Sequence, residues 1–204
     1  SNVSSYGANY PDILWYNTLT GQIWMYQMSF SHIHESAQVA LISDLNWQIN
    51  SVADLNGDGK DDILLRHAIN GTVWKYIMNS STITSSGKVM SAGSNWKLMV
   101  TADFDGDNDA DLLWRDTDSG RNYVYLLDNG VVNWNNRGQI SKFTDQLWVP
   151  VMAGDFDGDG DDDIFWHHFG NGKNYLYLMN GKLLDLKYIN TISGIFNFSF
   201  SMNS

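Results

Sequence analysis

Three aspartate-rich runs of nine residues are the part of this chain best suited to metal chemistry. They read DLNGDGKDD at 54–62, DFDGDNDAD at 103–111 and DFDGDGDDD at 155–163. So many carboxylates in one short turn repel one another unless a cation lies among them. Calcium accepts six to eight oxygen ligands in a flexible geometry. Each run therefore predicts a calcium loop with side-chain ligands at positions one, three, five and nine, and a main-chain carbonyl at position seven.

This spacing predicts five ligand residues in each loop. They are Asp54, Asn56, Asp58, Lys60 and Asp62 in the first loop, Asp103, Asp105, Asp107, Asp109 and Asp111 in the second, and Asp155, Asp157, Asp159, Asp161 and Asp163 in the third. An EF-hand would need a glutamate at position twelve, where this chain has Leu65, Trp114 and Trp166. An EF-hand is therefore disfavoured, and solvated acidic turns without metal remain the alternative.

The acidic runs belong to a repeat whose period is close to 50 residues. Their first aspartates are 49 and 52 residues apart. Each run leads into a short apolar segment, at 62–66, 111–115 and 163–167, and 12–16 is a fourth copy of it. A glycine follows nine residues after the aspartate that opens each segment, and then a strand with alternating aromatic residues, a pattern typical of half-buried strands. Such periods indicate a repeat architecture.

The two ends of the chain supply complementary parts of one repeat. Residues 196–203 align with 96–103, so the chain stops where a fourth turn begins, and residues 4–12 align with 54–62. A ring closed by its last strand removes exposed sheet edges. We therefore expect an all-β fold: one β-propeller domain over 1–204, with four blades of about four antiparallel strands. The predicted repeats are 1–46 plus 196–204, 47–95, 96–147 and 148–195.

The acidic loop, the segment after it and the aromatic strand resemble the FG-GAP or VCBS repeat. The match is D-x-D-G-D-G-x-x-D, then D-I-L-W-R, then G-x-x-Y-x-Y-L-M-N-G, and 155–181 is the closest copy. This family includes integrin α-subunit propellers, fungal and bacterial lectins, and accessory domains of secreted bacterial enzymes. The resemblance implies three structural calcium ions, one in each matching loop. Family members more often have seven or eight blades than the four predicted here.

Composition is consistent with a secreted or extracellular β protein. There are no cysteines, which a domain held by calcium does not need, and no apolar run is long enough for a membrane span. The formal net charge is −11, and three divalent cations would bring it to about −5. Nucleic acid needs a basic stripe to meet its phosphates, so we expect no nucleic-acid partner.

Catalytic motifs do not emerge from the sequence. It has no G-x-S-x-G, no P-loop and no dinucleotide fingerprint. His32 and His34 could form half of a zinc site, but no third ligand has a matching spacing. Whether the chain is an enzyme is left open, with binding favoured; a polysaccharide lyase built on a propeller is the less favoured alternative.

Recognition is the favoured function, because a ring of similar loops can combine weak sites into avidity. We expect lectin-like binding of glycans, with an interaction or scaffold domain for cell-surface or extracellular proteins as the alternative. Two chains pairing into an eight-bladed homodimer is a further alternative to a four-bladed monomer. The repeated aromatic residues Trp24, Trp74, Tyr123 and Tyr175 are read as packing residues. The expected contact residues are polar positions opposite the acidic turns, and one tryptophan outside the repeat pattern: Tyr16, Asn17, Arg66, His67, Arg115, Asp116, His167, His168 and Trp134.

Overall fold

The computed structural model describes residues 11–184 and 190–191, and in these residues every regular element is a β-strand. Three of the four larger sheets are four-stranded and one is three-stranded, and all are antiparallel. The first sheet contains β1 (Ile13–Tyr16), β2 (Gln22–Ser29) and β3 (His32–Leu41). The second contains β4 (Trp47–Ala53), β5 (Asp62–His67), β6 (Thr72–Asn79) and β7 (Thr82–Ser91). The prediction of an all-β fold is confirmed.

The third and fourth sheets repeat the order of the second. The third contains β8 (Trp96–Ala102), β9 (Asp111–Asp116), β10 (Arg121–Asp128) and β11 (Val131–Lys142). The fourth contains β12 (Trp148–Gly154), β13 (Asp163–His168), β14 (Asn174–Tyr177) and β17 (Asn190–Thr191), beside a ribbon of β15 (Met179–Asn180) and β16 (Leu183–Leu184). The first pair of strands in sheets two to four carries a register shift at the same place, after Ile49, Leu98 and Pro150. The repetition therefore extends to the bulges.

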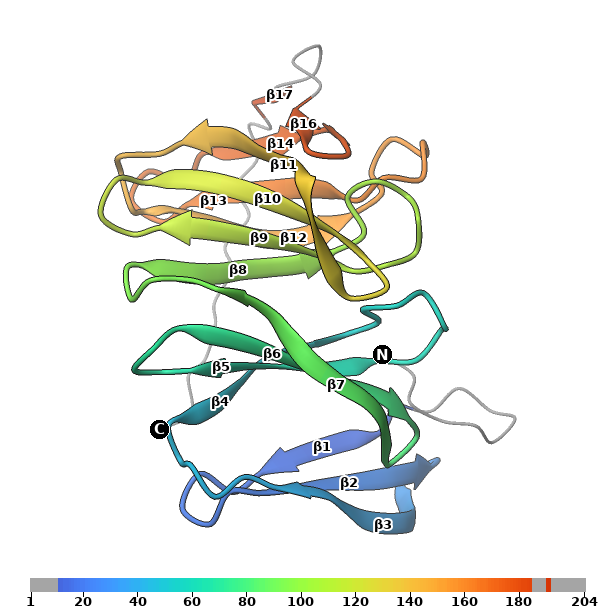
Figure 1. Cartoon of the computed structure of the whole chain (residues 1–204). Coiled ribbons are helices and arrows are strands. Elements are labelled where there is room, and N and C mark those ends of the chain that lie inside the picture. Colours follow the sequence, from blue (N-terminus) through green and yellow to red (C-terminus); the bar gives the residue numbers. More distant parts are fainter. Residues whose placement is uncertain (1–10, 185–189, 192–204) are drawn as a thin grey trace.

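Successive sheets pack face to face in a stack, with β1–β3 at the bottom of Figure 1 and β12–β14 behind β8–β11 in its upper half. Neighbouring sheets approach through their first strands, since β8 contacts both β4 and β12. Within the described residues this stack does not close into a ring, so the predicted four-bladed closure is not confirmed. The strand expected at 196–204 and the start of the first repeat lie outside the described residues.

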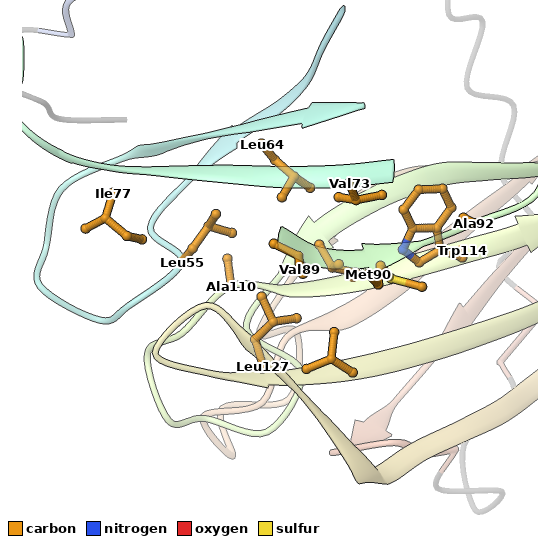
Figure 2. Packing of buried hydrophobic residues seen from close by; sticks show 12 residues of the cluster. Leu55, Leu64, Val73, Ile77, Val89, Met90, Ala92, Ala110, Trp114 and Leu127 are labelled. Atoms are coloured by element: carbon orange, nitrogen blue, oxygen red, sulfur yellow. The ribbon is translucent and has the colours of Figure 1, made fainter. Parts of the chain in front are cut away.

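Hydrophobic cores fill the three spaces between successive sheets. The middle core joins Leu64 and Val73 of the second sheet to Leu112 and Trp114 of the third. Figure 2 shows the packing around Leu64, Val73 and Trp114. Corresponding clusters join the first sheet to the second and the third to the fourth. Burial of apolar surface between sheets is thus the main force that holds the repeats together.

Candidate metal sites and contact residues

The acidic loops lie where the first strand of a sheet turns into the second, at one edge of the stack. The first aspartate of each loop folds the turn around its own carboxylate. Asp54 Oδ2 accepts a hydrogen bond from the Gly59 amide at 2.7 Å, and Asp103 Oδ2 accepts one from the Asn108 amide at 2.8 Å. Gly59 and Asn108 both have positive φ, +82° and +73°. A sharp left-handed turn at position six therefore points the remaining carboxylates of the loop toward one another.

The second and third loops bring carboxylates close enough to share one ion. One oxygen each from Asp103, Asp105 and Asp111 lies within 4.8 Å of the others. The same holds for Asp155, Asp157 and Asp159, which are all exposed. The first loop has an asparagine, Asn56, at position three.

Position three provides an acceptor that protein groups do not satisfy. Asn56 Oδ1 and Asp105 Oδ1 are both buried without a hydrogen-bond partner. A buried oxygen of this kind is costly unless a donor or a cation reaches it. An acceptor of this kind at the same position of two loops fits a divalent cation with oxygen ligands.

Electrostatics at these loops also favours a cation. The pKa of Asp105 is raised to about 6, chiefly by burial and also by the nearby carboxylates of Asp107 and Asp103. Burial raises the pKa of Asp111 to about 8, although hydrogen bonds from the Leu127 and Phe104 amides act in the opposite direction. Without positive charge nearby, the ionised forms of these groups are disfavoured, and a bound divalent ion would reverse this.

The aspartate at position nine also has a role that does not depend on metal. Its carboxylate accepts a hydrogen bond from an amide 16 residues further along in all four repeats, from Met28 in the first, Met78 in the second, Leu127 in the third and Met179 in the fourth. The first repeat keeps this contact through Asp12, although its acidic pattern is missing. Position nine therefore ties the start of its own strand to the chain at or just beyond the end of the next strand.

Position seven differs from a simple ligand position. The Asp109 carboxylate accepts a hydrogen bond from the Asn129 amide, and the Asp161 carboxylate accepts one from the Gly181 amide at 3.0 Å. These side chains therefore hold the following hairpin. Ligation through the position-seven carbonyls, including that of Lys60, stays a prediction.

Successive acidic loops are hydrogen-bonded to each other, a feature that sequence reasoning missed. The Asp54 carbonyl accepts from the Ala110 amide at 2.7 Å, and the Asp103 carbonyl accepts from the Asp162 amide at 2.6 Å. The Asp103 amide donates in return to Asp162 Oδ2 at 3.1 Å. A cation that orders one loop therefore also orders the edge between two sheets.

The polar residues at the opposite strand ends are mostly internal, which corrects their reading as an exposed contact surface. The buried ones are His67, Arg115, Asp116, His167 and His168. His67 Nε2 lies 2.9 Å from Asp44 Oδ2 and His168 Nε2 lies 2.8 Å from Asp145 Oδ2. Repetition of a polar residue at a strand end looked like surface variation, but these side chains fix the turns around them. Only Asn17 of the polar set is exposed, and its side chain caps the turn at Leu19.

Three of these residues connect neighbouring sheets through one repeated contact. Each lies four residues after its position-nine aspartate and donates to the carbonyl of the tryptophan that begins the next repeat. Tyr16 donates to Trp47 at 2.7 Å, Arg66 to Trp96 at 2.6 Å, and Arg115 to Trp148. The guanidiniums of Arg66 and Arg115 also lie 5.2 Å and 5.6 Å from the rings of Trp114 and Trp166 in the next sheet. These cation–π contacts add to the apolar packing that joins neighbouring sheets.

Replacing Arg66 with methionine is expected to lower the free energy of unfolding by about 2–4 kcal/mol, because three main-chain carbonyls lose a charged donor. Besides Trp96, these are the carbonyls of Ala92 and Gly93. Urea unfolding in calcium measures the change. Arg121→Met is the control, since Arg121 is half-exposed and its ion pair with Asp116 spans 3.5 Å, so a change within about 0.5 kcal/mol is expected there. Equal effects of the two substitutions would contradict the connecting role of Arg66.

Trp134 is exposed, as expected of a contact residue. Its exposed fraction is 52%. Its ring meets the Tyr125 ring edge to face at 6.1 Å, and the Arg137 guanidinium lies 5.3 Å from it. Trp74, Tyr175 and Trp24 are all half-buried; Trp74 and Tyr175 pack against the cores between sheets as expected, whereas Trp24 packs against none of these cores.

None of the described residues forms a helix with the length and apolar character needed to cross a bilayer.

Comparison with known proteins bears on the repeats rather than on the ends of the chain. The FG-GAP-like repeat matches residues 54–114 and again 103–166, which together span more than half of the chain. Among solved structures, the Vibrio cholerae (V. cholerae) biofilm matrix protein Bap1 is similar at 17% sequence identity and a TM-score of 0.39. The similarity covers 85% of this chain and 26% of that one, so this chain spans about a quarter of the Bap1 chain. A search of curated proteins finds no match. The two profile matches coincide with the acidic loops and the segments after them, and the chain belongs to the FG-GAP-like repeat family.

Proposed function

We propose that this chain is an extracellular binding module whose sheets are held in register by three structural calcium ions. The observation that carries the proposal is the buried acceptor at position three, Asn56 Oδ1 and Asp105 Oδ1, facing a loop of further oxygen ligands. Calcium supplies positive charge and six to eight oxygen contacts, and at modest affinity it fills its sites at the millimolar concentrations found outside cells.

The ligand sets of the three sites are the side chains at positions one, three, five and nine, with the main-chain carbonyl at seven. These residues bind and orient the ion, and the carbonyl and amide contacts between loops transmit that order to the next sheet. The module requires no reaction step. Its proposed output is a rigid stack that presents surface residues at fixed positions.

For the ligand, we favour glycans, since an exposed tryptophan beside a tyrosine and an arginine provides a flat ring and a donor. Trp134, Tyr125 and Arg137 form this group on the third sheet. A protein-interaction or scaffold role is the second candidate, supported by the exposed apolar face of the first sheet, where Trp15 is 59% exposed.

A glycan array probed with calcium-loaded protein separates the two candidates. We expect binding to defined sugars, and we expect Trp134→Ala to weaken it about tenfold or more, consistent with loss of an aromatic contact. Phe30→Ala is the matched control, because Phe30 is 75% exposed at the turn between β2 and β3, far from this group. A blank array with correctly folded protein would favour the scaffold role.

A further inference from the structure

Among the described residues, the first sheet has an apolar face that lacks the partner its counterparts have in the other sheets. Ile13 and Trp15 of β1 are 42% and 59% exposed. Their equivalents, at the same distances after the position-nine aspartate, are almost completely buried: Ile63 and Leu65 are 1% exposed, Leu112 0%, Trp114 1%, and Ile164 and Trp166 0%. The difference lies in what covers this face and not in its residue types.

In sheets two to four, this face packs against the sheet that precedes it in the chain. Ile63 and Leu65 pack against Ile23 and Met25 of the first sheet. Leu112 and Trp114 pack against the second sheet, and Ile164 and Trp166 against the third. The aromatic residues of the next strand follow the same rule, since Trp74 packs toward the first sheet. Their counterparts Trp24 and Tyr26 line a shallow hollow with Trp15.

The fourth sheet carries the complementary face, the one that would receive a following sheet. In sheets two and three that face contains Leu64 and Leu113, which are 1% and 0% exposed. The equivalent Phe165 and the nearby Leu176 are only half-buried, and Val151 of β12 is 37% exposed. Both halves of one further sheet-to-sheet contact are therefore present in this chain.

The two faces are far apart within one molecule. The second and third sheets lie between them, so the first and fourth sheets form opposite ends of the stack (Figure 1). A second copy of the chain provides the missing partner for each face. We propose that the face formed by Ile13, Trp15, Trp24 and Tyr26 binds the fourth sheet of a second copy, head to tail, so that a pair of chains buries both sets of faces.

This contact would repeat the one that joins sheets within the chain. Arg66 and Arg115 reach over the tryptophans of the following sheet, and His167 occupies the equivalent position in the fourth sheet, opposite Trp15 of the second copy. A head-to-tail contact of this kind joins two different surfaces. Two copies form a closed dimer when each chain covers half of the ring. A sugar bound on Trp15 is the other occupant that the aromatic face allows. The burial of every equivalent residue against a protein sheet favours the second copy.

Light scattering after size exclusion, in calcium and over a range of concentrations, tests the proposal. We expect a species of twice the 23.1 kDa chain mass that dissociates on dilution. Trp15→Glu is expected to raise the dissociation constant about 30-fold or more, since a buried tryptophan is a typical hot spot. Trp134→Glu is the matched control, an exposed tryptophan on the third sheet, and should still dimerise. Circular dichroism and melting confirm that both variants fold. A monomeric wild-type chain at all concentrations would overturn the proposal, whether or not Trp15 then binds sugar.

Cysteine cross-linking tests the orientation of the two copies. The sequence has no native cysteine that could form a competing disulfide. Separate Trp15→Cys and Phe165→Cys chains, mixed and oxidised, are expected to give a heterodimeric disulfide. Neither variant oxidised alone should give more than a trace of dimer. A disulfide dimer from Trp15→Cys alone would indicate a symmetric contact and overturn the head-to-tail arrangement. A chain that carries both Trp15→Cys and Phe165→Cys gives a further test. If it forms a disulfide only within one chain at every dilution, the first and fourth sheets meet within a single chain, and the proposed contact with a second copy is wrong.

Discussion

In excess chelator, the melting temperature of this protein is expected to fall by on the order of 20 °C relative to millimolar calcium. An ion that binds only the native state at 100 times its dissociation constant stabilises it by about 2.7 kcal/mol. Three such sites give on the order of 8 kcal/mol, and in a domain of this size each kcal/mol shifts the melting temperature by about 2–4 °C. Differential scanning calorimetry with and without chelator measures the shift. Equal melting under both conditions would leave the acidic loops without a structural ion.

One variant separates metal ligation from ordinary loop structure by the sign of its effect. Asp105→Ala removes a buried oxygen without a partner and a carboxylate whose pKa is raised by burial and by its acidic neighbours. In calcium this variant should be less stable than wild type and should bind two ions instead of three in titration calorimetry. In chelator it should be equally stable or more stable, because a self-repelling charge is gone. Asp118→Ala, an exposed aspartate outside the acidic loops, should change neither quantity.

The parts of the fold that could be predicted from sequence are those encoded within one repeat. Aromatic and aliphatic residues at every second position place a strand such as β6, and the turn chemistry at Gly59 and Asn108 places the acidic loops. Both depend on residues close together in sequence. The close approach of Asp103, Asp105 and Asp111 follows from the same local geometry, so the central part of the candidate metal site was predictable.

Contacts between repeats were not predictable in the same way. The sequence shows that Arg66 and Arg115 occupy one position of the repeat, but not that each reaches a carbonyl about 30 residues away in the next sheet. A charged residue at a strand end ordinarily lies in solvent, so both were read as surface. A signal was available: a donor at this position in three repeats always precedes a repeat that begins with tryptophan. Ring closure is not confirmed within the described residues, and it depends on the angle between sheets, which no residue pattern specifies.

In the first three repeats, the glycine nine residues after the position-nine aspartate has a strict steric cause, and its loss is expected to be among the most damaging single substitutions. Gly120 has φ of +74°, and a Cβ placed there would lie 1.7 Å from the Phe143 carbonyl oxygen. The Gly120 carbonyl meanwhile accepts a hydrogen bond from the Phe143 amide at 2.8 Å, so the two segments cannot separate without losing it. Gly21 and Gly71 show the same approach, to the carbonyls of Ile42 and Ala92 at 1.9 Å and 1.8 Å. The repeated glycine therefore lies in the turn before β2, β6 or β10. The residue that directly follows the last strand of the sheet passes close to this turn.

Gly120→Ala is accordingly expected to lower the free energy of unfolding by more than about 3 kcal/mol, through backbone strain of about 1–2 kcal/mol together with displacement of the segment at Phe143 that follows β11. Gly87→Ala is the matched control, because Gly87 has no positive φ and a Cβ there would meet nothing within 4 Å. That variant should stay within about 0.5 kcal/mol of wild type. Urea unfolding in calcium measures both, and the soluble yield serves as a second measure if Gly120→Ala fails to fold. Similar stability of the two variants would mean that the segment at Phe143 can move away freely, in which case the glycine would be needed for its backbone angle alone.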